Sequence, residues 1–273
     1  MTKRRLGQHF LSDPRILARI AGATEAGPGD TVLEIGPGPG GLTQALLARG
    51  AHVVAIEKDP DLLPALKQRA AEAVVVEGDA LELDWRVIAR PQRNQRDWRD
   101  VVVTGNIPYN ITSPLLDKAL APSLPKRVVF LVQKEVADRV IARPATADYG
   151  ALTVGVQSVA SAERLFTVPA GAFAPPPKVD SAVLRLTPLT TPLIDDSERR
   201  DFRALVVGLF GFRRKQLLRA LREHTGWDAG RARAILERVG LDPTVRPETL
   251  SPVEFAALFR ALPSGLPASP DPA

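Results

Sequence analysis

Short apolar runs rich in Val and Ile alternate with amphipathic segments between residues 31 and 188. Buried strands of a parallel sheet have this continuous apolar character. The runs therefore predict strands at residues 31–35, 52–57, 73–77, 100–104, 127–133, 163–168 and 181–186. Helical spacing predicts helices at residues 42–49, 60–71, 114–120, 135–142 and 151–158. Strands and helices in this order are typical of βαβ units around a parallel sheet.

The last two predicted strands are joined by a proline-rich segment, residues 169–180, without a crossover helix. Parallel neighbours need such a crossover, so these two strands are expected to pair antiparallel. A seven-stranded, mostly parallel sheet with an antiparallel pair at its end resembles the Rossmann-like α/β fold of Class I methyltransferases. This likeness concerns the fold alone and carries no function by itself.

The pattern becomes purely helical after residue 197, with helices predicted at residues 198–210, 215–223, 228–239 and 252–262. We therefore expect a catalytic domain with an N-terminal arm in residues 1–188 and a smaller helical domain in residues 189–262. Residues 263–273 are mainly Pro, Ser and Ala and are predicted to be disordered. Residues 90–99 are predicted to form a polar surface loop.

Composition narrows the classes of protein to consider. The 273 residues, 45% of them hydrophobic, suffice for one full core and a smaller domain. The chain has no cysteine, which excludes disulfides and thiolate metal sites, and its three scattered histidines argue against a catalytic metal. Polar residues interrupt any signal sequence near the N-terminus, and no apolar run approaches the ~20 residues that span a bilayer. We expect a cytoplasmic protein that has no membrane or metal partner.

Basic residues are concentrated in the helical region. Eleven arginines and lysines against four acids give Arg199–Arg238 a net charge of +7, compared with +5 for the whole chain. Arg213, Arg214 and Lys215 lie between two predicted helices, and Arg219 and Arg222 follow one and two turns later. A solvated helix surface is the ordinary explanation for such a run, and a phosphate-binding face is the alternative.

A glycine-rich segment follows the first predicted strand and precedes a helix. Gly36, Gly38 and Gly41 satisfy G-x-G-x-x-G, and Glu57 ends the next strand, where a carboxylate can bind ribose hydroxyls. These features alone fit a dinucleotide cofactor equally well. Asp79, however, ends the third strand, where it can accept a hydrogen bond from an adenine amine. A carboxylate placed to bind the ribose, followed by a carboxylate placed to bind the adenine, favours S-adenosylmethionine as the cofactor.

The segment Asn106-Ile-Pro-Tyr109 follows the fourth predicted strand. The side-chain oxygen of Asn106 and the backbone carbonyl of Ile107, which Pro108 leaves free, can both accept hydrogens from one exocyclic amine. Tyr109 can stack on the ring that carries this amine. Two acceptors favour a pyramidal nitrogen with an exposed lone pair, so the segment predicts alkylation of adenine N6. The plainer interpretation is a strand that ends in an Asn-x-Pro turn.

The chain resembles the ribosomal small-subunit (16S) RNA adenine-N6 dimethyltransferases of the KsgA type over nearly all of residues 3–262. The matching segments begin at Gly7 (GQHFL), Val32 (VLEIGPGPGGLT), Gly78 (GDA), Gly105 (GNIPYNI), Gln133 (QKEV), Tyr149 (YG), Phe173 (FAPPPKVDS) and Phe212 (FRRKQ). His9 stands where the family often has Asn, and Ile107 where Leu is common. Neither difference removes a chemical group that the reaction needs.

The resemblance implies S-adenosylmethionine as the cofactor, held by His9, the backbone of Leu11, Gly36, Gly38, Glu57, Lys58, Asp79, Ala80 and Asn106. It implies a catalytic set of Asn106, Ile107, Pro108, Tyr109 and Phe173, in which Phe173 stacks on the face of the adenine opposite Tyr109. The family dimethylates two adjacent adenosines near the 3′ end of 16S rRNA during small-subunit biogenesis. We therefore expect a monomer that binds the small ribosomal subunit through its basic helical residues.

Three alternatives remain at this point. Relatives that act on large-subunit RNA and cause antibiotic resistance share the amine clamp, although the Pro-rich loop and the N-terminal arm favour the small-subunit enzyme. A non-catalytic RNA-binding or assembly factor would use the same basic residues. An NAD-dependent dehydrogenase fits the glycines but has no need for the amine clamp.

Overall fold

The computed structural model describes residues 8–89 and 97–263, which fall into two compact units. The first unit comprises residues 1–137 and 162–188, and the second comprises residues 138–161 and 189–273. The predicted tail and most of the predicted polar loop, residues 264–273 and 90–96, lie outside the described residues. The sequence predicted one change of domain at residue 188, whereas the second unit also takes residues 138–161 from the middle of the chain.

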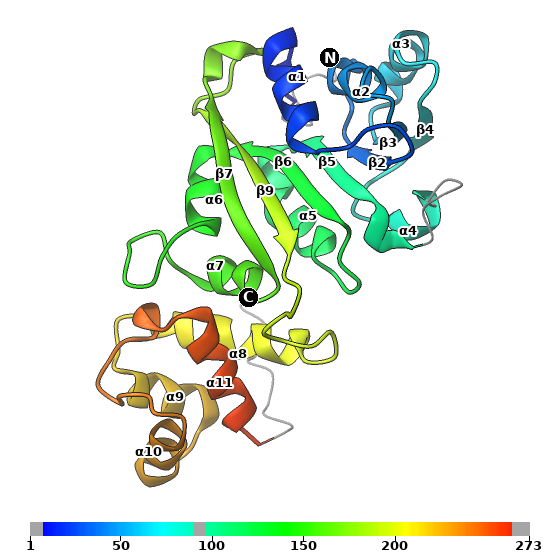
Figure 1. Cartoon of the computed structure of the whole chain (residues 1–273). Coiled ribbons are helices and arrows are strands. Elements are labelled where there is room, and N and C mark those ends of the chain that lie inside the picture. Colours follow the sequence, from blue (N-terminus) through cyan, green and yellow to red (C-terminus); the bar gives the residue numbers. More distant parts are fainter. Residues whose placement is uncertain (1–7, 90–96, 264–273) are drawn as a thin grey trace. The chain divides into compact units, whose positions relative to one another are not determined.

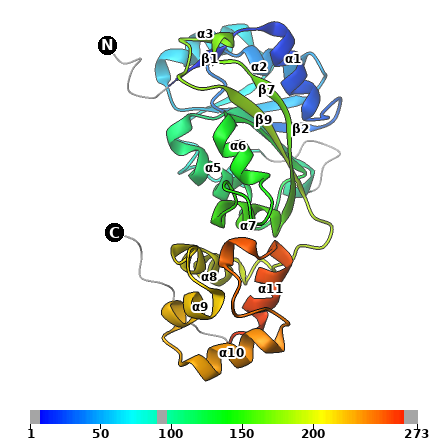
Figure 2. The ribbon, with the colours of Figure 1, turned by 90° about the vertical axis from the view of Figure 1, so that its left-hand side faces the viewer.

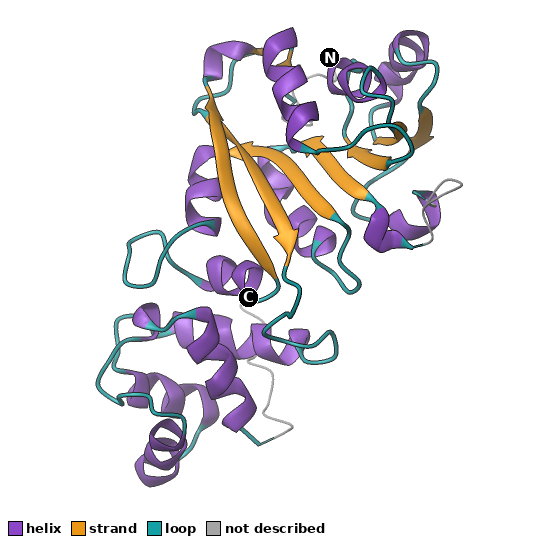
Figure 3. Ribbon diagram, in the orientation of Figure 1, coloured by secondary structure: helices purple, strands orange, loops and turns teal. Residues whose placement is uncertain are grey.

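The first unit is built on one seven-stranded sheet with the strand order β4-β3-β2-β5-β6-β9-β7. Figure 3 shows its strands side by side. They are β2 (Thr31–Ile35), β3 (His52–Glu57), β4 (Val74–Glu77), β5 (Val102–Asn106), β6 (Arg127–Gln133), β7 (Ala160–Val168) and β9 (Ser181–Pro188). Strands β2 to β6 pair in parallel, and β9 pairs with β6 antiparallel. The mostly parallel α/β sheet predicted from the apolar runs is confirmed.

Helices cover both faces of this sheet, as a doubly wound order of strands requires. Helices α1 to α3 lie on one side and α5 on the other (Figure 2). The helices up to β7 are α1 (Pro14–Ala23), α2 (Gly41–Leu47), α3 (Leu63–Arg69), α4 (Trp85–Ile88), α5 (Thr112–Ala119), α6 (Lys134–Val140) and α7 (Ala151–Gln157). The spacing analysis did not predict α1, although Asp13 caps it by accepting from the N–H groups of Arg15 and Ile16. An Asp-Pro pair before a helix is a recognisable signal for its start.

A second, two-stranded sheet was not expected from the sequence. β1 (Phe10–Leu11) pairs antiparallel with β8 (Phe173–Ala174), so that Leu11 lies opposite Phe173. The N-terminal arm is thereby fixed to the Pro-rich loop that joins β7 to β9. A strand of two residues has no periodicity, so nothing in the local pattern could predict this pairing.

The helices of the second unit pack around their own apolar core. They are α8 (Arg199–Gly211), α9 (Leu217–Thr225), α10 (Ala229–Arg238) and α11 (Pro252–Ala261), coloured yellow to red in Figure 1. Tyr149 and Val154, from the inserted residues 138–161, belong to this core. The Tyr149 hydroxyl donates to the carbonyl of Leu250 at 2.6 Å. The inserted residues therefore supply part of the interior of the helical unit.

Candidate active site

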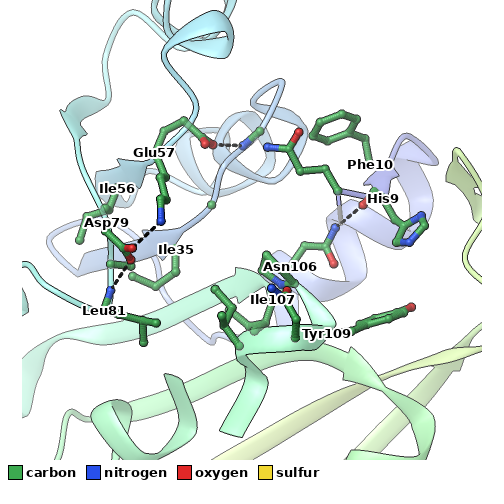
Figure 4. Close-up of a pocket in the computed structure, with 18 of the residues that line it drawn as sticks. His9, Phe10, Ile35, Ile56, Glu57, Asp79, Leu81, Asn106, Ile107 and Tyr109 are labelled. Carbon is green, nitrogen blue, oxygen red and sulfur yellow. Dashed lines mark hydrogen bonds and ion pairs between the residues drawn. The ribbon is translucent and has the colours of Figure 1, made fainter. Parts of the chain in front are cut away.

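A cavity of about 190 Å³ lies where β2, β3, β4 and β5 end. The carboxyl ends of parallel strands are the usual binding edge of such a sheet. Every residue predicted to bind the cofactor or the target adenine lines this cavity, except Leu11 and Phe173. Figure 4 shows Glu57 and Asp79 on one side of it and Asn106 and Tyr109 on the other. The sequence therefore located the cavity and most of its polar groups.

The glycine-rich loop after β2 forms one wall. Gly36 and Gly38 have φ angles of +65° and +56°, which residues with a Cβ rarely adopt. A Cβ at Gly38 would lie 3.0 Å from the ring of Phe10 in the N-terminal arm. Glycine at this position therefore allows both the turn of the loop and the close approach of the arm.

Glu57 links this loop to the end of β3. The side chain is 4% exposed, and its Oε2 accepts the Gly38 N–H at 3.0 Å while Oε1 accepts the Asp59 N–H at 2.8 Å. Burial raises the pKa of Glu57, although these backbone hydrogen bonds oppose the rise. Each carboxylate oxygen keeps a second lone pair, so Glu57 can still accept hydrogen bonds from ligand hydroxyls.

Asp79 lies at the edge of the cavity, and each of its two carboxylate oxygens has a partner. Its Oδ2 is 2.6 Å from the Lys58 ammonium, and its Oδ1 accepts the Leu81 N–H at 2.8 Å. The hydrogen bond from Lys58 lowers the pKa of Asp79, so this carboxylate stays ionised near neutral pH. Lys58 itself is exposed and acts here as the partner that orients Asp79.

Apolar side chains line the part of the cavity between the two carboxylates and Asn106. Ile35, Ile56 and Ile107 line the cavity together with Leu81. Such a lining suits a flat ring whose polar edges reach the carboxylates. The sequence analysis did not single out Ile35 and Ile56, because every residue of these buried strands is equally apolar.

Asn106 has one possible orientation of its amide. Its Nδ2 donates to the backbone carbonyl of His9 at 2.8 Å. Because a carbonyl only accepts, the amide nitrogen must face His9 and Oδ1 must point away from it. Within the described part of the chain, Oδ1 has no hydrogen-bond partner. The arm therefore leaves one oxygen of Asn106 available as an acceptor at the cavity.

Tyr109 is fixed at the mouth of the cavity. Its hydroxyl forms a hydrogen bond of 2.8 Å with the Ser181 hydroxyl at the start of β9. Its ring lies 5.7 Å from the His9 ring, centroid to centroid, at 34°. The His9 ring is held in turn, because its Nδ1 donates to the carbonyl of Pro175 at 2.8 Å. Burial raises the pKa of Tyr109, so the phenol is neutral.

Two predicted residues do not line this cavity. Phe173 is 5% exposed and packs with Leu11, Val168 and Val183 in the core of the first unit. Its backbone pairs with Leu11 in the two-stranded sheet. Phe173 does not line this cavity, and the ring recorded beside Tyr109 is that of His9, so stacking by Phe173 remains a prediction. Leu11 lines a small adjoining cavity below the glycine-rich loop.

Glu34, in the middle of β2, lines this adjoining cavity with Leu11 and Asn106. It is 1% exposed, and its Oε2 has no hydrogen-bond partner in residues 8–89 and 97–263. Burial raises the pKa of Glu34 to about 8, and the charge of Glu57 adds to the rise. Glu34 is therefore largely protonated at neutral pH, which is why a carboxyl group is tolerated inside the sheet.

The predicted RNA-binding residues lie together on the second unit but differ in their surroundings. The Arg213 guanidinium holds Glu248 with two contacts, of 2.9 and 2.8 Å. Arg219 forms a looser pair with Glu223 at 3.5 Å. Arg214, Lys215 and Arg222 are exposed and form no ion pair with a residue that the structure describes. These three side chains are the ones most available to an anionic partner.

Two kinds of feature are absent from the residues that the structure describes. No group of three or more His, Cys, Asp or Glu side chains is arranged to hold a metal ion there. Among the same residues, no helix has the length and apolar character needed to cross a membrane.

Several named proteins are similar to this chain in sequence or in structure. Ribosomal RNA small subunit methyltransferase A of Nitratidesulfovibrio vulgaris is 44% identical over 269 residues, which cover 95% of this chain and 96% of that protein. A dimethyladenosine transferase from Plasmodium falciparum superposes with a TM-score of 0.77 at 28% identity, covering 92% and 96% of the two chains.

The 23S rRNA methyltransferase ErmE superposes with a TM-score of 0.69 at 28% identity, covering 93% of this chain and 99% of its own. A family model described as ribosomal RNA adenine dimethylase matches residues 1–262. The resemblance inferred from the sequence motifs is therefore confirmed: this chain belongs to the ribosomal RNA adenine dimethylase family.

Proposed function

We propose that this protein catalyses the S-adenosylmethionine-dependent N6,N6-dimethylation of two adjacent adenosines near the 3′ end of 16S rRNA, during assembly of the small ribosomal subunit. One observation carries the proposal. The hydrogen bond from Asn106 to the His9 carbonyl leaves Asn106 Oδ1 without a partner among the residues that the structure describes, and so available as an acceptor, in a cavity that also holds two carboxylates. A site with this arrangement suits an amine nucleophile beside an adenosyl cofactor.

The residues of the cavity fit S-adenosylmethionine. Glu57 has free lone pairs for the ribose hydroxyls, and Asp79 is held at the cavity edge, where an adenine amine can donate to it. Gly36 and Gly38, both at positive φ, place backbone without a side chain at the wall of the cavity. When bound, this cofactor supplies a methyl group made electrophilic by its sulfonium. Ile35, Ile56 and Ile107 keep water away from the bound base.

The clamp after β5 would orient the target amine. Asn106 Oδ1 and the carbonyl of Ile107 are the two acceptors, because the carbonyl of Pro108 already accepts from the Ile111 N–H at 3.1 Å and from the Thr112 hydroxyl at 3.2 Å. Binding both amine hydrogens exposes the nitrogen lone pair. The proton that N6 loses passes to water, so the protein's contribution is mainly positioning.

The target adenosine must leave its helix to enter this site. Tyr109 can stack on one ring face only if the base is unpaired and splayed out. Stacking on an aromatic side chain contributes about 1–3 kcal/mol per base. Tyr109 therefore accounts for part of the binding of the target base and for the angle at which the amine is presented.

We further propose that the second unit binds rRNA phosphates through Arg214, Lys215 and Arg222, assisted by Arg213 and Arg219. This proposal is supported by the exposure of the first three side chains and by the net charge of the region. Since the proposed substrate is the assembling small subunit, we expect the protein to act in the cytoplasm. Light scattering after size-exclusion chromatography would test the expectation that it is a monomer.

The decisive experiment is incubation with immature small subunits and methyl-labelled S-adenosylmethionine, followed by nucleoside analysis. We expect labelled N6,N6-dimethyladenosine at two adjacent positions of 16S rRNA and strongly reduced labelling with the Asn106→Ala variant. Large subunits and 23S rRNA serve as the parallel substrates. Preferential labelling of 23S rRNA would instead support the activity named for ErmE, and absence of label in every RNA would refute the proposal.

A further inference from the structure

A hollow in the helical unit shares no lining residue with the cavity of the first unit. Gln216, just before α9, lines this hollow together with Leu218, Arg219, Arg222 and Glu223 of that helix. Helix α9 ends at Gly226 in a left-handed conformation, with φ +73°. The chain turns there, so that Trp227 also borders the hollow.

Trp227 is unusual among the tryptophans of this chain. Trp85 and Trp98, the other two, are 3% and 8% exposed and belong to the first unit. Trp227 is only partly buried: it packs against the helical core and also borders the hollow. The Arg231 guanidinium lies over its ring, 4.1 Å from the centroid. This cation–π contact restrains the indole and covers one face of its ring, so a stacked base has to use the other face.

The charges beside Trp227 favour an anion. Arg222 is exposed and forms no ion pair with any described residue, and Arg219 is only loosely paired with Glu223 at 3.5 Å. An aromatic side chain flanked by arginines provides stacking and phosphate contacts together, which is how proteins bind unpaired nucleotides. An acidic peptide would use the arginines but would have no ring for the indole to stack on.

We infer that this hollow binds one unpaired nucleotide of the rRNA, with the base stacked on Trp227 and its phosphates on Arg222 and Arg219. The nucleotide is distinct from the target adenosine, which is bound in the first unit. The inference rests on the proposed function, because it assumes that the helical unit binds rRNA. Phosphate contacts alone do not distinguish one RNA structure from another. Stacking on Trp227 would make this surface respond to an unpaired base.

Variants of Trp227 separate stacking from packing. Trp227→Leu keeps apolar contact with the helical core but has no aromatic ring. Trp227→Phe keeps an aromatic ring, which is smaller than the indole. We expect Trp227→Leu to weaken binding to protein-free 16S rRNA about tenfold, and Trp227→Phe to weaken it less than threefold. Thermal unfolding of both variants must match the wild type within a few degrees, which identifies any loss of affinity caused by misfolding.

Arginine variants test the phosphate contacts. Arg222→Gln is expected to weaken RNA binding and to reduce the slope of log affinity against log salt by about 1. Arg233→Gln is the matched control, because Arg233 is an exposed arginine of α10 that does not line the hollow. An equal loss with both variants would mean that only overall charge matters and would contradict the inferred site.

Fluorescence gives a direct readout. Titration of the full-length protein with a short unstructured RNA oligonucleotide should quench tryptophan emission in the wild type. Trp227→Phe retains Trp85 and Trp98, so it reports any signal that arises elsewhere, and we expect it to show little quenching. Equal quenching in both proteins would overturn the inference.

The outcomes also separate this inference from the proposed function. If Trp227→Leu binds rRNA like the wild type while methylation proceeds, the hollow has no role in RNA binding and the proposed function stands. If the wild type neither binds nor methylates small-subunit RNA, the proposed function itself fails. A defect of Trp227→Leu on immature subunits but not on protein-free 16S rRNA would assign the hollow to a ribosomal protein and overturn the inference.

Discussion

The polar groups of the cavity are fixed by hydrogen bonds to the backbone, whereas the most exposed basic side chains of the helical unit are not fixed by ion pairs with described residues. Asn106, Glu57 and Asp79 are each fixed by at least one hydrogen bond to the backbone. Arg214 and Lys215 are exposed and form no ion pair with the described residues. Chemistry at one nitrogen needs groups placed in advance, whereas a phosphate backbone can be bound by side chains that adapt. Losses of rate and losses of RNA affinity should therefore come from different variants.

The largest effect is expected from Asn106→Ala. Removing one of two acceptors for the target amine should lower the single-turnover methylation rate about 100-fold or more. RNA affinity should stay within twofold, because the helical unit is intact. Rapid-quench methylation and filter binding measure the two quantities. A rate within threefold of the wild type would show that Asn106 does not orient the amine.

Glu57→Gln should come next and should affect cofactor affinity. The amide keeps one acceptor oxygen but loses the charge and one set of lone pairs, so we expect at least tenfold weaker binding of S-adenosylmethionine in calorimetry. Glu77→Gln is the matched control, since Glu77 pairs in register with Glu57 on the neighbouring strand but does not line the cavity. Similar losses in both variants would argue against a ribose contact.

Replacing Arg213, Arg214 and Lys215 together by Ala should affect only the RNA binding that we assign to the second unit. We expect rRNA affinity to fall about five- to tenfold and the salt slope to decrease by about 2. Rates at saturating RNA and cofactor affinity should be unchanged. Because Arg213 already holds Glu248, Arg213→Ala should contribute least of the three single variants. Binding that does not change across a salt series would remove this surface from RNA capture.

Glu34→Gln should have the smallest effect on activity and a distinct effect on stability. The pKa of Glu34 rises from 4.5 to about 8 in the folded protein, so the folded state binds more protons between these values. The wild-type free energy of unfolding should therefore fall as pH rises from about 4.5 to 8, by at most about 1.4 kcal/mol per pH unit from this group. Glu34→Gln should lose that dependence.

Urea unfolding at pH 5 and pH 8 measures this difference. The stability of Glu34→Gln relative to the wild type should increase between the two pH values. Glu237→Gln, at an exposed position of α10, should follow the wild type at both pH values. Parallel curves for Glu34→Gln and the wild type would show that Glu34 is ionised in the folded state.

The sequence predicted which polar groups meet at the cavity because these groups end strands. Glu57 and Asn106 are the last residues of β3 and β5, and Asp79 closely follows β4. In a parallel sheet these ends meet at one edge, so chain position alone predicts their proximity. Ile35 and Ile56 also line the cavity, but no pattern distinguishes them from the other residues of strands buried on both faces.

Contacts between distant segments of the chain could not be predicted in this way. The pairing of Leu11 with Phe173 joins two strands of two residues each, too short to show a period. This pairing turns Phe173 into the core and brings His9 beside Tyr109. The orientation of Asn106 depends on the same arm, through the carbonyl of His9. Local patterns therefore gave the positions of these groups but not their partners.

The division of the chain has a practical consequence for taking the protein apart. The chain passes between the two units three times, after residues 137, 161 and 188. A fragment that stops at residue 188 would keep Tyr149 and Val154 without the helices that cover them. Such a fragment would expose an apolar surface that promotes aggregation. A chimera that exchanges the helical unit with a relative must therefore graft two separate stretches of sequence, not one.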